Sequence, residues 1–235
     1  MLKRHFFKFL FLFMFLYFLF NFPTYIRLED DYVVCLDSLK SNNKSLQNQY
    51  YFAITANQKK EIVAHTTEYL QHLIAKDLPT FWYGTPWDYS GTTQVPNEGH
   101  IACGYYVSTI LRDAGFKVER RKLAQQASEK IVKTLVSEKY IKRFSRKKIR
   151  PFLEEMNKLG EGLYVVGLDT HVGFLLVEDG KKRFIHSART TKGVVNENAW
   201  RSKVLIRSKY RIVGRLLPND EVVEKWLAGE SFTVK

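Results

Sequence analysis

The stretch from His171 to Ala188 reads HVGFLLVEDGKKRFIHSA, and it decides how the second half of the chain folds. Two apolar runs flank Asp179-Gly180, a dipeptide typical of a two-residue β-hairpin turn. Such a turn places His186 opposite Gly173 and His171 opposite Ala188. Because side chains alternate between the two faces of a strand, both imidazoles are expected on one face, a diagonal step apart.

The rest of the sequence predicts helices before this hairpin and further strands around it. Apolar residues at helical spacing run from Asn57 to about Lys76, and Gly115 is a natural end for a helix that starts at Cys103. Residues 121–159 are also predicted to be helical, with a break near Ser145. The predicted strands are Leu163–Leu168, His171–Val177, Arg183–Ala188 and, with breaks, Val204–Leu217, and a last helix follows Asn219-Asp220. Helices first and a mostly antiparallel sheet afterwards indicate an α+β fold.

Cys103 stands where a glycine-bearing loop runs into an amphipathic helix. The chain has 2 cysteines, so this thiol is not part of a disulfide framework. A helix N-terminus stabilises a thiolate, and its unpaired N–H groups are suited to binding an oxyanion. We therefore expect a catalytic triad in which Cys103 is the nucleophile, His171 the general base and His186 the residue that orients the base. Asn196 or Asn198 is the alternative orienting residue.

An irregular loop rich in aromatic residues and glycine, residues 81–91, precedes the cysteine. Its aromatic side chains are expected either to pack in the core or to form the wall of a substrate cleft. The position of the loop directly before the expected nucleophile supports the cleft. The candidates for the cleft wall are Trp82, Tyr83, Trp87 and Tyr89.

Three segments of the sequence resemble the NlpC-type cysteine peptidases of the papain-like superfamily, which also holds the CHAP amidases. They are the aromatic-glycine loop 81–84, the base strand 168–177 and the strand 184–188. The resemblance implies a papain-like fold, with N-terminal helices packed on an antiparallel sheet. It also implies hydrolysis of amide bonds in peptidoglycan peptides, with Cys103, His171 and His186 as nucleophile, base and orienting residue.

The nucleophile segment departs from the family's usual Asp-Cys-Ser-Gly, because this chain has Ala102-Cys103-Gly104-Tyr105. Two alternatives to a hydrolase therefore stay open. One is a catalytically inactive member of the fold that binds cell-wall peptide or a protein partner. The other is an acyltransferase.

The chain is strongly basic, with a formal net charge of +13 over 235 residues. Such a charge favours anionic partners, such as acidic cell-wall polymers or a membrane surface contacted through basic helices. Seven Lys or Arg residues lie between Lys139 and Arg150, in a stretch read first as a solvated helix face and second as a polyanion contact. The sequence carries no nucleic-acid-binding motif, and its His and Cys spacing predicts no metal and no cofactor.

The N-terminal segment, residues 1–22, has basic residues followed by an unbroken apolar run from Phe9 to Phe20. This length is typical of a signal peptide, while the lack of an Ala-x-Ala-like site favours an uncleaved signal anchor. Either way the remainder is expected to be exported, to the periplasm or another extracytoplasmic space. Residues 23–56 are predicted to be a polar connector, and residues 57–235 to be the catalytic domain.

Overall fold

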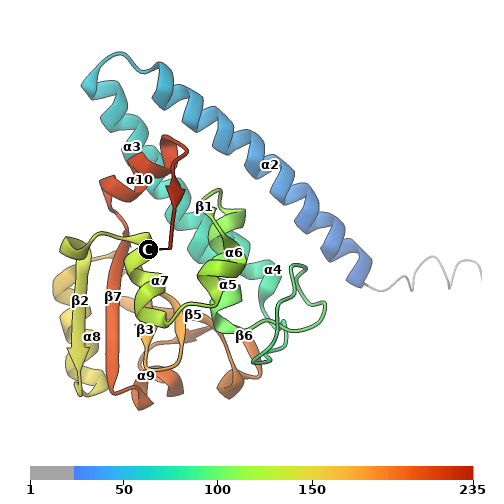
Figure 1. The fold of residues 1–235 in the computed structure, drawn as a ribbon, viewed down its shortest axis with the longest axis vertical. Helices are drawn as coiled ribbons and strands as arrows, with labels where there is room; N and C mark the ends of the chain where they lie inside the picture. The colour runs from blue at the N-terminus through green and yellow to red at the C-terminus, as the bar shows by residue number, and fades with distance from the viewer. Residues whose placement is uncertain (1–23, 235) are drawn as a thin grey trace, which may run out of the picture.

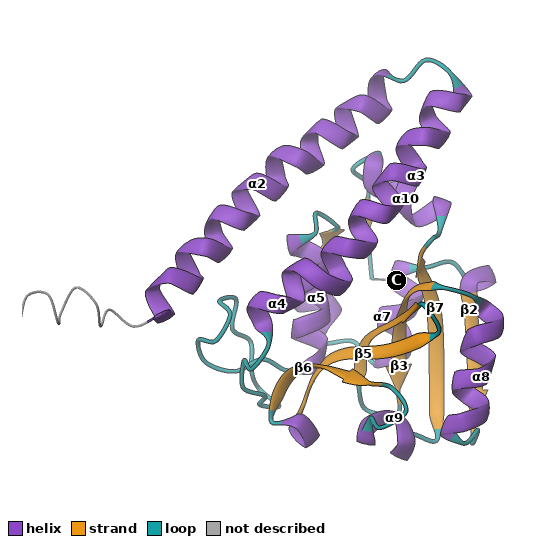
Figure 2. Cartoon of the chain, turned by 180° about the vertical axis from the view of Figure 1, so that it is seen from behind, coloured by secondary structure: helices purple, strands orange, loops and turns teal. Residues whose placement is uncertain are grey.

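The computed structural model describes residues 24–234, so the predicted signal segment 1–22 lies outside the described residues. The fold is mixed α+β and is built around one antiparallel sheet (Figures 1 and 2), as the sequence predicts. The helices are α2 (Thr24–Phe52), α3 (Ala56–His72), α4 (Leu78–Trp82), α5 (Cys103–Asp113), α6 (Arg120–Ala124), α7 (Ser128–Leu135), α8 (Ile149–Leu159), α9 (Lys203–Arg207) and α10 (Asp220–Leu227). Shorter helical turns are η1 (Leu73–Asp77), η2 (Glu138–Tyr140) and η3 (Arg189–Thr191).

Six strands form the main sheet in the order β2-β7-β3-β4-β5-β6, and every neighbouring pair is antiparallel. They are β2 (Ile141–Ser145), β3 (Gly162–Leu168), β4 (Val172–Glu178), β5 (Lys181–Ala188), β6 (Gly193–Asn198) and β7 (Tyr210–Leu217). A small parallel pair, β1 (Lys117–Val118) and β8 (Ser231–Phe232), lies apart from this sheet.

The β4–β5 hairpin has the predicted register, with Glu178 paired to Lys181 across the turn. Asp179 and Gly180 both have positive φ, at 50° and 68°, which is the backbone of a type I′ turn. His171 lies one residue before β4, so the predicted strand began one residue early.

Two strands of the main sheet occur where the sequence patterns did not predict them, and the short pair β1 and β8 was not predicted either. β2 lies within the stretch predicted to be helical. It is an edge strand whose basic side chains lie in water, so its sequence lacks the clear alternation of apolar and polar residues by which a strand is recognised. β6 pairs with β5 as the other edge of the sheet. Its last three residues are polar, so it lacks the apolar pattern by which a strand is recognised.

Helices cover both faces of the sheet. One face packs Val165, Phe174 and Ile185 against α5 and α7 in the larger core cluster. The other face packs Tyr164 and Leu175 against α8 in a second cluster. Because successive strand residues point to opposite faces, alternate buried residues of β3, β4 and β5 fall in different clusters.

The predicted polar connector is wrong, since residues 24–52 form the single long helix α2. It runs antiparallel to α3 and away from the sheet, with the turn between them at one extremity of the molecule (Figure 1). Tyr32, Leu39 and Leu46 are buried at seven-residue spacing, a narrow apolar stripe on an otherwise polar helix. Among residues 24–234, none of the helices combines the length and the apolar character needed to cross a membrane.

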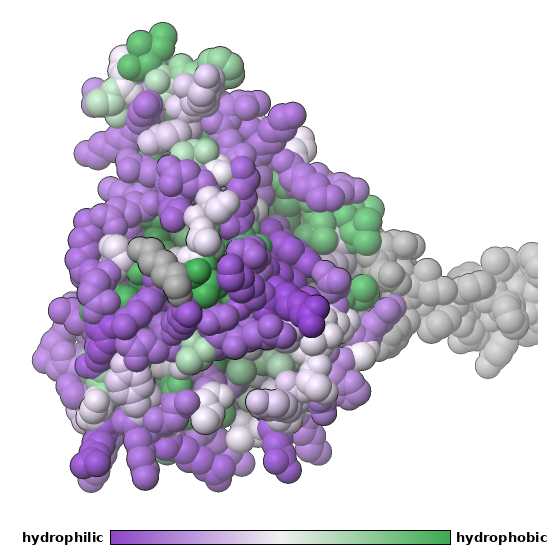
Figure 3. Space-filling model, in the orientation of Figure 1, coloured by the Kyte–Doolittle hydropathy of each residue, from purple (hydrophilic) through white to green (hydrophobic). Residues whose placement is uncertain are grey.

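The surface in Figure 3 is largely hydrophilic, as expected for so basic a chain. Apolar side chains gather at the turn between α2 and α3, where Phe52 and Ile54 are exposed (Figure 3).

Candidate active site

Cys103 is the first residue of α5, and no side chain caps this end of the helix. The helix is held in place by its buried residues Tyr106, Val107 and Ile110. The next residue, Gly104, is required by the packing of α6, because a Cβ there would lie 2.3 Å from the carbonyl oxygen of Ala124. The thiol is thus fixed at a helix N-terminus with free backbone N–H groups beside it.

The two predicted histidines meet. Nε2 of His171 lies 2.9 Å from Nδ1 of His186, and the two rings are nearly perpendicular. Gly173 creates the space, because a Cβ at that position would lie 2.8 Å from the Cβ of His186. A side chain larger than hydrogen at residue 173 would therefore displace His186 or Phe184.

A carboxylate that the sequence reasoning missed continues this chain of contacts. Oε1 of Glu197, on β6, lies 3.0 Å from Nε2 of His186. Glu197 pairs with Phe184 across the sheet and so shares the face of His186. The alternation of β6 was the available signal, but it required β6 to be recognised as a strand.

The predicted alternatives to His186 face elsewhere. Asn196 and Asn198 pair with Ile185 and Arg183, on the opposite face of β5 from His186. Oδ1 of Asn196 accepts a hydrogen bond from Arg183 Nε at 2.8 Å, and Oδ1 of Asn198 accepts one from the Trp200 N–H at 2.9 Å. Neither amide orients His171.

The hydrogen bonds assign the ring protons. A carboxylate only accepts, so Nε2 of His186 carries a hydrogen that it donates to Glu197. Nδ1 of His186 is then an acceptor, and Nε2 of His171 donates to it. This leaves Nδ1 of His171 with a free lone pair, which is the state needed to accept a proton.

Burial keeps the resting thiol and the resting base neutral. Burial raises the pKa of Cys103, although the N–H groups of Val172, Gly104 and Cys103 itself partly offset the effect. Burial, together with the neighbouring His186 ring, holds the pKa of His171 far below its usual value. Because the Val172 N–H lowers the pKa of the thiol, the sulfur lies beside Val172, the residue that follows His171. The pair is therefore set up for proton transfer during the reaction and not as a preformed ion pair.

Glu197 is ionised in this site. Burial opposes the charge, but hydrogen bonds from His186 and Ser202 outweigh it and keep the pKa of Glu197 below its usual value. The same carboxylate partly offsets the fall that burial causes in the pKa of His186. A positive charge that forms on the histidine pair is thus stabilised from behind by Glu197.

Cys103 and His171 line the same open groove, with a volume of about 710 Å³. Trp87 and Tyr89, two of the predicted cleft residues, lie on its wall. Trp82 does not, because it is fully buried and its Nε1 donates to the Tyr32 hydroxyl at 3.0 Å. Tyr83 is partly buried and is not among the lining residues. Of the four predicted cleft residues, these two therefore do not lie on the wall of this groove.

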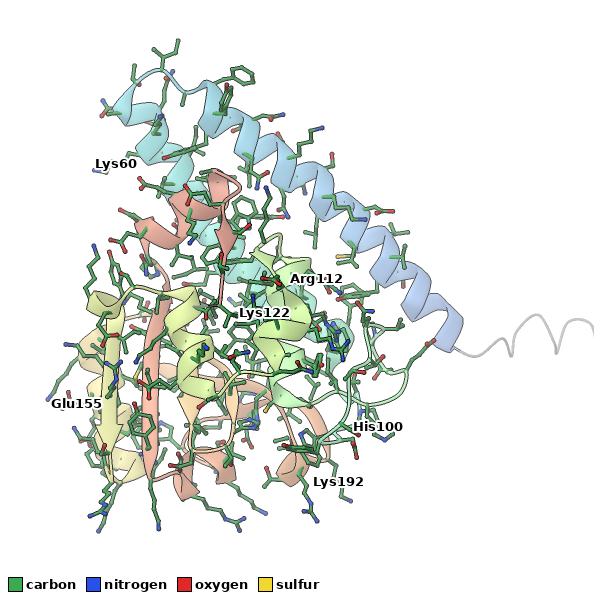
Figure 4. The ribbon with its side chains drawn as sticks, viewed as in Figure 1. Lys60, His100, Arg112, Lys122, Glu155 and Lys192 are labelled. Carbon is green, nitrogen blue, oxygen red and sulfur yellow. The ribbon has the colours of Figure 1, made fainter. Side chains whose placement is uncertain are left out.

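His100 lies on the exposed loop between α4 and α5 (Figure 4). In residues 24–234 no group of three or more His, Cys, Asp or Glu side chains is arranged to hold a metal ion.

No protein family, curated protein or solved structure matches this chain. The geometry of the groove is therefore the main basis for assigning a function.

Proposed function

We propose that this protein is a cysteine hydrolase that cleaves amide bonds, with Cys103 as nucleophile, His171 as general base and His186 as the orienting residue. One observation carries the proposal. The relay from Glu197 through His186 to His171 leaves a lone pair on the nitrogen of His171 that is free of the relay, in a groove that also holds a thiol at a helix start.

The reaction proceeds in two acyl-transfer steps. His171 takes the proton of Cys103 as the sulfur attacks the carbonyl carbon, and free N–H groups at the start of α5 stabilise the oxyanion. His171 then gives its proton to the leaving amine as the C–N bond breaks, which leaves a thioester on Cys103. Water, deprotonated by His171, cleaves that thioester and restores the thiol.

The likeness to NlpC-type peptidases supports peptidoglycan peptides as substrates and a papain-like classification of the fold. The apolar segment 1–22 supports export to the periplasm or another extracytoplasmic space, with attachment to the membrane if the segment is retained. An exported cell-wall amidase is consistent with both features.

Hydrolysis of purified peptidoglycan fragments by a protein that starts at Thr24 tests the function. Mass spectrometry should detect new amine and carboxyl ends, and Cys103→Ala should abolish them. Cys35→Ala is the matched control, since Cys35 lies on α2 and is not among the groove residues. Equal product from the Cys103→Ala variant, or transfer of the acyl group to an added amine in preference to water, contradicts the proposal.

A further inference from the structure

Four cationic side chains surround the groove at Cys103. Arg121 of α6 and Arg189 of η3 line the groove itself. Lys203 and Arg207 of α9 line an adjoining pocket, which shares His171 and three other residues with the groove. Positive charge therefore approaches the thiol and its base from three separate elements.

Among the side chains that the structure describes, those of residues 31–234, none of these four has a partner, neither an ion pair nor a hydrogen bond nor an aromatic ring. The basic stretch 139–150 differs in this respect. Its Lys139 pairs with Glu221, and its Arg143 pairs with Glu138 and Glu129. Positive charge is thus partly neutralised on β2 and left available at the groove.

Acidic side chains do not compensate for this charge. No Asp or Glu is among the residues that line the groove. The adjoining pocket contains Asp169, but Oδ2 of this carboxylate accepts from Ser208 Oγ at 2.8 Å and from the Lys209 N–H at 2.7 Å. Its Oδ1 accepts from the Tyr210 N–H at 3.1 Å. The potential that a substrate meets in this groove is therefore positive.

We infer that the groove selects acidic peptides, in which the residues flanking the scissile amide carry free carboxylates. This inference names the substrate class of the proposed hydrolase and so rests on that function. A guanidinium presents paired N–H donors that match the two oxygens of a carboxylate, and both groove-lining cations are arginines. Carboxylates bound by Arg121 and Arg189 would hold the amide between them over Cys103.

Alkylation with two reagents of different charge tests the charge of the groove without requiring hydrolysis. In a Cys35→Ser background, the rate of Cys103 modification is measured with anionic iodoacetate and with neutral iodoacetamide at one pH. Any change in the thiolate fraction affects both reagents equally, so the ratio of rates reports the field that the reagent meets. The double variant Arg121→Gln/Arg189→Gln should lower the ratio of the iodoacetate rate to the iodoacetamide rate by roughly twofold to fivefold at low salt. The decrease should be smaller at high salt, because salt screens the charges.

Lys60→Gln/Lys181→Gln removes the same total charge away from the groove and should leave the ratio unchanged. Lys60 lies on α3, far from the loops that carry His100 and Lys192 (Figure 4), and Lys181 lies at the opposite end of β5 from the groove. Equal ratios in both double variants would overturn the inference, because the effect would then come from the net charge of the whole protein.

Protection of Cys103 by short peptides tests the ligand class. A peptide with Glu and Asp residues should slow the reaction with iodoacetamide, and the same peptide with Gln and Asn should not. Protection by inorganic triphosphate alone overturns the assignment to carboxylates. If neutral and acidic peptides are hydrolysed equally well, the inference fails while the proposed hydrolase stands. If the groove shows the charge effect but no peptide is cleaved, the proposed function fails.

Discussion

Glu197→Gln is the most informative single change, because it removes a negative charge and keeps the size of the side chain. When His171 accepts the thiol proton, positive charge forms within the histidine pair, whose ring centres lie 5.0 Å apart. The Glu197 oxygen is 3.0 Å from Nε2 of His186, so about 8 Å separates it from the protonated imidazole of His171. At an effective dielectric constant of ~20, Coulomb's law gives about 2 kcal/mol at that distance. Partial solvent exposure of Glu197 reduces this to about 1–2 kcal/mol.

We therefore expect kcat/KM for amide hydrolysis to fall by about 5-fold to 30-fold in Glu197→Gln. The pKa of His186, followed by NMR, should fall further as well, because Glu197 raises it against the effect of burial. A merely structural role would leave that pKa unchanged.

Asn196→Ala and Asn198→Ala are the matched controls, since both amides lie on the other face of β6. They should leave kcat/KM within about twofold of the unchanged protein, which corresponds to less than ~0.5 kcal/mol. A Glu197→Gln protein with normal kcat/KM, an unchanged pKa of His186 and an unchanged melting temperature would refute the relay.

Three further outcomes follow from the site and its surroundings. The rate of Cys103 alkylation should rise only at pH values above the usual thiol pKa of about 8.5, because burial raises the pKa of this thiol; a plateau extending below neutral pH would indicate a preformed ion pair instead. Gly104→Ala should destabilise the protein by about 1–3 kcal/mol in a denaturant titration, because its Cβ would lie 2.3 Å from the oxygen of Ala124; unchanged stability would contradict that contact. Trp82→Phe should lower stability by about 1–3 kcal/mol through the lost hydrogen bond to Tyr32 while kcat/KM stays the same, whereas a change in kcat/KM alone would favour the cleft-wall reading.

The hairpin could be predicted because its information is local. Asp179-Gly180 selects a turn type, the turn fixes the register, and the register puts both histidines on one face. The meeting of His171 and His186 follows from those steps alone. The helix α5 could also be predicted from local information, since the glycine-bearing loop before Cys103 marks its start and Gly115, which has positive φ, marks its end.

The missed features depend on contacts between distant segments. α2 has only a narrow buried stripe, and its helix is supported by α3 and α10, so the polar residues between Ser38 and Ser45 resembled a linker. β6 is recognised as a strand mainly through its pairing with β5, and without β6 there was no reason to consider Glu197. Trp82 illustrates the same limit, because its partner Tyr32 is 50 residues away in the chain.

The direct measurement of the central claim is the rate at which iodoacetamide modifies Cys103 at pH 8, in a Cys35→Ser background, with and without His171→Ala. If His171 is the base that takes the thiol proton, we expect the rate to fall by about tenfold or more in the His171→Ala protein, in line with the usual contribution of a positioned base. Equal rates in two folded proteins would contradict the claim that this groove is a cysteine active site.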